Sequence, residues 1–185
     1  MKSITLLTLL TSLSISAFAA DSSITQSYIQ LSEQKKLEQD KTWLRLMYAN
    51  EKGKSEVEYS GYFLSNQGKS DLKKELHSNI QALFQSAESN QSVRCRFPAR
   101  SQWIMRQLEI QESELPAVEC PEYDQWMGQI KPYKATLIYA TDFMGNPSSM
   151  FGHTLLRLDP KDQKQLNLVS YAINYAATVN GGDNW

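Results

Sequence analysis

The spacing of the hydrophobic residues changes once along the chain, near residue 131, and this change limits the folds it can adopt. Before it, apolar side chains recur every three or four positions, as in Leu72, Leu76, Ile80 and Leu83, the spacing of one helix face. After it, β-branched and aromatic residues form short runs typical of strands. The sequence therefore predicts an α+β fold, in which a helical N-terminal half precedes the start of an antiparallel sheet.

Residues 22–50 carry the first helical pattern. Aspartate is a preferred N-cap residue, so Asp40 can end one helical stretch and cap a second. Gly53 is the first glycine after the pattern and is expected to end it. We therefore predict two consecutive helices here, followed by a loop with short extended pieces.

Two further helices are expected before residue 131. Ser70 or Asp71 can cap the first, whose apolar stripe also includes Phe84. Pro98 suits the first turn of the second, because a missing N–H costs nothing there. We assign Trp103, Leu108 and Ile110 to the core. Residues 20–130 are thus predicted to form a helical region, and residues 131–185 the first strands of a second domain.

Three runs after residue 131 are predicted as strands, at 134–141, 153–159 and 166–176. The first, KATLIYAT, reads as a buried strand. The loop 142–152 and the polar turn 160–165 would join them. Because so small a sheet leaves an open edge, we expect it to be incomplete and the chain to be a fragment truncated at Trp185.

The first 19 residues are predicted to be a signal peptide. They combine one lysine, an apolar run from about Ile4 to Ile15 and the sequence Ala17-Phe18-Ala19, which is typical of a secretory signal with its cleavage site. The apolar run is shorter than the roughly 20 residues that cross a bilayer. The mature chain is therefore expected to be exported.

Charge composition argues against one class of partner. The chain has 19 basic and 20 acidic residues, so it lacks the positive excess of nucleic-acid-binding proteins.

Four arginines gather between residues 94 and 106. They can bind an anionic head group, but the interpretation as surface charges or partners of nearby glutamates is favoured. They are Arg94, Arg96, Arg100 and Arg106.

Cys95 and Cys120 are the only cysteines. In an oxidising compartment two lone cysteines usually pair, which predicts a disulfide. The alternative is that one of them is a catalytic thiol.

His153 follows a glycine at the start of a predicted strand. Imidazole titrates near neutral pH, so it can serve as a base. Asn174 shares its strand face with two alanines, Ala172 and Ala176, on a strand expected to pair with that of His153. It can therefore hold the imidazole in one tautomer. The alternative is that Asn174 satisfies backbone groups at a strand end.

Other catalytic and metal sites are less favoured. His77 and His153 are the only histidines and lie in different halves of the chain, so no metal-ligand spacing exists. His77 reads as a half-exposed helix residue. Ser148 and Ser149 lack the G-x-S-x-G motif of a serine nucleophile and read as turn residues. We predict no metal and no cofactor.

Four motifs together resemble the Lnb N-terminal periplasmic domain family of exported bacterial proteins. They are WLRLMYANEKGKSEVEYSGYFLSNQGKSDLKKEL, RCRFPARSQWI, NPSSMFGHTLLRLD and LVSYAINYAA, in this order over nearly all of the mature chain. The resemblance implies a periplasmic location and a core similar to the circularly permuted papain-like fold of the NlpC group. It also implies that His153 corresponds to the family's histidine and Asn174 to the polar residue on the next strand.

The family takes its name from a lipoprotein N-acyltransferase, so the resemblance implies thiol-dependent acyl transfer. A cysteine downstream of the last strand would be the nucleophile in this family, and the sequence up to Trp185 contains none there. The 185 residues alone are therefore expected to be inactive. A phospholipid and a lipoprotein N-terminus are the implied partners, with contact to a membrane surface. The alternatives are a cysteine hydrolase of cell-wall peptide or lipid, and a non-catalytic envelope-binding module.

Overall fold

The computed structural model describes residues 23–140, 153–161 and 171–174. The chain divides into two compact units, Met1–Pro121 and Glu122–Trp185, and each is described by itself. The predicted signal peptide, the loop 142–152 with Ser148 and Ser149, and most of the turn 160–165 lie outside the described residues. Among the helices described, none has the length and apolar character that crossing a bilayer requires.

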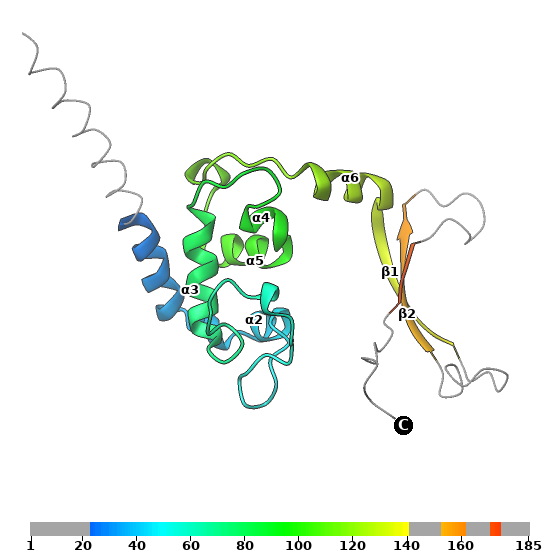
Figure 1. The fold of residues 1–185 in the computed structure, drawn as a ribbon, viewed down its shortest axis with the longest axis horizontal. Coiled ribbons are helices and arrows are strands. Elements are labelled where there is room, and N and C mark those ends of the chain that lie inside the picture. The colour runs from blue at the N-terminus through cyan, green and yellow to red at the C-terminus, as the bar shows by residue number, and fades with distance from the viewer. Residues whose placement is uncertain (1–22, 141–152, 162–170, 175–185) are drawn as a thin grey trace, which may run out of the picture. The chain divides into compact units, whose positions relative to one another are not determined.

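The first unit is helical (Figure 1). Asp40 and Asp71 act as N-caps, since their carboxylates accept hydrogen bonds from the Thr42 and Lys74 amides at 2.7 and 3.0 Å. Pro98 occupies the first turn of its helix, as predicted. The elements are a helix over residues 23–34, η1 (Leu37–Gln39), α2 (Lys41–Leu46), η2 (Ser60–Tyr62), α3 (Leu72–Leu83), α4 (Val93–Arg96), α5 (Pro98–Leu108) and η3 (Glu112–Glu114).

A single hydrophobic cluster fills this unit. The Trp43 and Trp103 rings stack in it with centroids 5.6 Å apart, and the Trp43 indole N–H donates to the Leu72 carbonyl at 3.2 Å. Helix α3 packs against α4 and α5. The predicted core residues of α3 and α5 are confirmed: Leu72, Leu76, Ile80, Leu83, Trp103, Leu108 and Ile110 are buried, and Phe84 packs partly buried against them.

One helix end differs from the prediction. Helix α2 ends at Leu46 and not near Gly53, because Tyr48 adopts the left-handed conformation with φ 50°. This residue changes the direction of the chain, and the Ala49 amide then donates a hydrogen bond to the Leu44 carbonyl at 2.9 Å. A tyrosine therefore holds the position that glycine usually holds in such a cap.

The second unit begins with α6 (Pro121–Ile130) and continues into a three-stranded antiparallel sheet (Figure 1). Its strands are β1 (Pro132–Ala140), β2 (His153–Pro160) and β3 (Tyr171–Asn174), in the order β1-β2-β3. The predicted α+β class, with helices before an antiparallel sheet, is confirmed. All three predicted strands are present within the described residues.

The prediction that KATLIYAT is buried is wrong, because none of residues 134–139 is buried and only Thr136 and Ile138 are partly covered. Leu137 and Tyr139 of β1 are 71% and 63% exposed. An apolar run is typical of a strand covered on both faces, but the described side chains of this run are exposed or only partly buried. The composition of a strand thus predicts its conformation and not what packs on it.

Candidate functional site

The strand register relates the two predicted catalytic positions. His153 is the first residue of β2 and pairs with Ala140, whereas Leu155 pairs with Asn174 of β3. Residues two apart on a strand share a face, and directly paired residues also share a face. His153 and Asn174 therefore occupy diagonal positions on the same face, a relationship that typically places Cα atoms about 7–8 Å apart.

This relationship agrees with the pairing that the sequence predicted for the two strands. The roles of base for His153 and positioning residue for Asn174 stay predictions.

A polar network lies on the same face at the other end of β2. The Arg157 Nε lies 2.8 Å from a carboxylate oxygen of Asp159, and the Thr136 hydroxyl donates to the other oxygen at 3.0 Å. Asp159 is only 5% exposed, so these contacts balance the cost of burying its charge. Asp159 lies six positions after His153 on the strand, roughly 20 Å away at the rise of a β-strand. The network therefore stabilises the sheet at a distance from the histidine.

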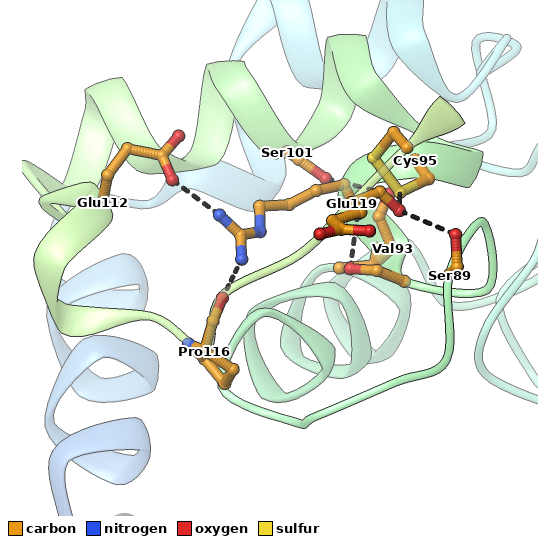
Figure 2. Close-up of a disulfide and its surroundings, with 10 residues drawn as sticks. Ser89, Val93, Cys95, Ser101, Glu112, Pro116 and Glu119 are labelled. Carbon is orange, nitrogen blue, oxygen red and sulfur yellow. Dashed lines mark hydrogen bonds and ion pairs between the residues drawn. A yellow bond between two sulfur atoms is a disulfide. The ribbon is translucent and has the colours of Figure 1, made fainter. Parts of the chain in front are cut away.

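The cysteines form a disulfide, with Cα atoms of Cys95 and Cys120 5.3 Å apart. The predicted disulfide is confirmed, and the alternative of a free catalytic thiol among these two cysteines is wrong. Figure 2 shows the bond where α4 meets the segment that leads to Cys120. The Glu119 carbonyl accepts a hydrogen bond from the Ser89 hydroxyl at 3.4 Å in the same region.

Arg94 also contacts the segment that leads to Cys120, through an ion pair and a hydrogen bond. Its Nη1 lies 2.6 Å from the Glu112 carboxylate, and its Nη2 donates to the Pro116 carbonyl (Figure 2). The other three arginines of the predicted cluster are also engaged. Arg106 donates to the Gln102 carbonyl at 3.3 Å. These contacts agree with the interpretation of the arginines as structural partners.

Arg100 forms a buried ion pair that sequence reasoning missed. Its Nη1 lies 3.5 Å from the Glu75 carboxylate, and the two side chains are 3% and 0% exposed. The guanidinium lies over the Tyr62 and Phe97 rings, 3.9 and 4.2 Å from their centroids. Glu75 lies on the apolar stripe of α3, one turn from Leu72. A charged residue at a core position was the available signal of a buried partner.

The Glu75 carboxylate also fixes the loop before α3. It accepts hydrogen bonds from the Leu64 and Ser65 amides at 3.0 and 2.9 Å, and from the Asn79 side chain at 2.8 Å. Charged groups tolerate burial only with several such partners. This cluster is thus a structural centre of the helical unit.

His77 lies on α3, with its Nε2 3.5 Å from the Glu33 carboxylate. Burial lowers the pKa of His77 below its usual range, although the Glu33 charge opposes this effect. No group of three metal-binding side chains occurs in the described part of the chain. The structure thus agrees with a packing role for His77.

Two protein families match the chain in separate regions. Residues 122–184 match the Lnb N-terminal periplasmic domain, and residues 35–107 match a domain of unknown function (DUF7843). The motifs that begin WLRLMYAN and RCRFPAR therefore lie within the match to the domain of unknown function. Only the motifs NPSSMFGHTLLRLD and LVSYAINYAA lie within the Lnb match. No curated protein and no solved structure matches the chain.

Proposed function

Because residues 122–184 belong to the Lnb N-terminal periplasmic domain family, we propose that this chain supplies His153 and Asn174 to a periplasmic thiol-dependent acyl-transfer enzyme. The family name implies a periplasmic location, which supports an exported, envelope-associated domain. The observation that carries the proposal is the register, in which His153 and Asn174 occupy diagonal positions on one face of the sheet.

In this proposal His153 acts as the base. It takes the proton of a cysteine thiol, and the thiolate attacks the ester carbonyl of a phospholipid. His153 then returns the proton to the departing alcohol, which leaves a thioester. The α-amine of a lipoprotein N-terminus attacks the thioester, forms an amide and releases the thiol. Asn174 acts as a positioning residue that favours one tautomer of the imidazole.

The nucleophile has to come from outside these 185 residues. Both cysteines of the sequence are bonded to each other, so neither can form a thioester while the disulfide is intact. A cysteine at a helix N-terminus would have a lowered thiol pKa and amide donors for the oxyanion.

The disulfide also favours a second candidate function. A chain in which every cysteine is oxidised can serve as a non-catalytic module that binds envelope components. In one assay the acyltransferase predicts a labelled amide, whereas the binding module predicts no labelled product.

The assay uses the protein as purified from its own cells. It is mixed with a phospholipid whose acyl chain is isotopically labelled and a lipoprotein N-terminal peptide with a free α-amine. Labelled amide that disappears in His153→Ala supports the acyltransferase. Labelled free fatty acid with the same His153 dependence indicates a hydrolase. Neither product, or products that persist in His153→Ala, contradicts the proposal. His77→Ala, the other histidine, is the matched control and should keep activity.

A further inference from the structure

An aromatic residue, Tyr48, follows the C-terminus of α2 at a position where glycine is the favoured residue. The Tyr48 amide donates to the Arg45 carbonyl at 3.1 Å, and the Ala49 amide donates to the Leu44 carbonyl at 2.9 Å. This pair of hydrogen bonds is the Schellman motif, whose left-handed position is usually glycine. Tyr48 holds that position with φ 50°, a conformation that is costly for a bulky side chain.

Burial of the ring does not compensate for this strain. Tyr48 is 60% exposed, and its ring lies edge-on to the Tyr62 ring, with centroids 6.2 Å apart. Strained residues that gain little from packing occur often at binding sites. The position therefore points to a use of the ring outside the fold.

The surroundings of Tyr48 form an open hollow of about 330 Å³. Arg45 and Glu56 are among the residues that line it, and both are exposed. Within the described residues, neither side chain makes an ion pair or a side-chain hydrogen bond with another. The hollow is lined by Leu44, Arg45, Tyr48, Ala49 and Glu56.

Backbone and side-chain contacts hold this hollow in one shape. The Glu56 amide donates to the Tyr48 carbonyl at 3.0 Å, and the Ser55 hydroxyl donates to the Met47 carbonyl at 2.6 Å. The Tyr62 hydroxyl donates to the Leu46 carbonyl at 2.5 Å. A preformed site loses less conformational entropy when a ligand binds, because its side chains and loops are already ordered.

We propose that this hollow is a carbohydrate-binding site, in which the ring of a neutral saccharide stacks on Tyr48. Arg45 and Glu56 bring one charge of each sign, so the hollow has no net charge that favours an anion or a cation, and a wholly apolar ligand would leave both charges without partners. A sugar has an apolar ring face for Tyr48, together with hydroxyls that donate to Glu56 and accept from Arg45.

The test exploits the strain at Tyr48. Tyr48→Gly removes the ring and relieves the backbone, so it should raise the melting temperature while weakening saccharide binding at least tenfold. A residue with only a structural role would not give this opposite pair of effects. Lys36→Gly is the matched control, because Lys36 is also left-handed, with φ 53°, and exposed. It should raise the melting temperature and leave binding unchanged.

Binding is measured on the whole chain by calorimetry and by saturation-transfer NMR, with the N-acetylglucosamine trimer and the glucose trimer as probes. Saturation transfer to the sugar ring protons that is lost in Tyr48→Gly is the expected result. Arg45→Gln and Glu56→Gln should each weaken binding severalfold. The proposal is overturned if neither trimer binds, if binding survives in Tyr48→Gly, or if proline-rich and aromatic peptides occupy the Tyr48 hollow in place of both trimers.

Discussion

The Arg100 guanidinium lies 3.5 Å from the Glu75 carboxylate inside the helical unit, with both side chains almost wholly buried. The pair joins α5 to α3 and, through the amides of Leu64 and Ser65, to the loop before α3. Its partners satisfy the carboxylate on several sides, so removal of either charge should disturb several contacts together.

Glu75→Gln should destabilise the protein by about 3–5 kcal/mol, the usual cost of leaving one member of a buried ion pair alone. Chemical unfolding followed by circular dichroism measures the change. Glu58→Gln provides the control, because Glu58 pairs with Lys69 on the surface and should change stability by about 1 kcal/mol or less. Equal losses in the two variants would contradict the structural role assigned to Glu75.

Substitution of Gly68 should destabilise the protein, because the Glu75 carboxylate lies close to this glycine. A Cβ at residue 68 would lie 2.3 Å from Oε2 of Glu75 and 2.9 Å from Cβ of Phe63. We expect Gly68→Ala to cost about 1–3 kcal/mol through overpacking. Gly128→Ala should instead be neutral or gain up to about 1 kcal/mol, because Gly128 lies within α6 with open space around it. Thermal unfolding of the two variants checks the contrast.

The Cys95–Cys120 bond should contribute about 3–4 kcal/mol, from a loop of 25 residues in the chain-entropy model. Replacement of both cysteines by serine should lower the free energy of unfolding by that amount. A reductant should destabilise the native chain to the same extent and leave the double variant unchanged. A double variant that responds to the reductant would show that the effect has another source.

Stability at alkaline pH should depend on Tyr28. Burial, together with the hydrogen bond to Glu114 at 2.7 Å, raises the pKa of Tyr28 from 10.0 to about 12. A raised folded-state pKa stabilises the fold fully below pH 10, and this contribution is lost as the pH rises from 10 to 12. Urea unfolding across this range should show a steeper decline for the native chain than for Tyr28→Phe. Parallel declines would contradict the assignment.

Local signals in the sequence predicted much of the fold. The caps Asp40 and Asp71 and the first-turn Pro98 act within one helical turn, so their neighbours in the sequence suffice to identify them. The strand at His153 and its pairing with the strand of Asn174 followed from alternation and turn residues.

The missed features depend on contacts between distant residues. Glu75 was not recognised as buried because its partner Arg100 is 25 positions away. The end of α2 was misplaced because Tyr48 takes the left-handed conformation that the sequence suggested for a glycine. The exposure of Leu137 depends on what covers the sheet, and nothing within the strand encodes that.

The most direct measurement for the central claim is the intact mass of the protein, from its own cells, after incubation with a phospholipid donor. We predict a mass increase equal to one acyl chain that hydroxylamine removes, because thioesters are cleaved by this reagent. The increase should be absent in His153→Ala and present in His77→Ala. An acyl adduct that forms equally in His153→Ala, or no adduct in the native protein, would contradict the assignment of His153 as the base.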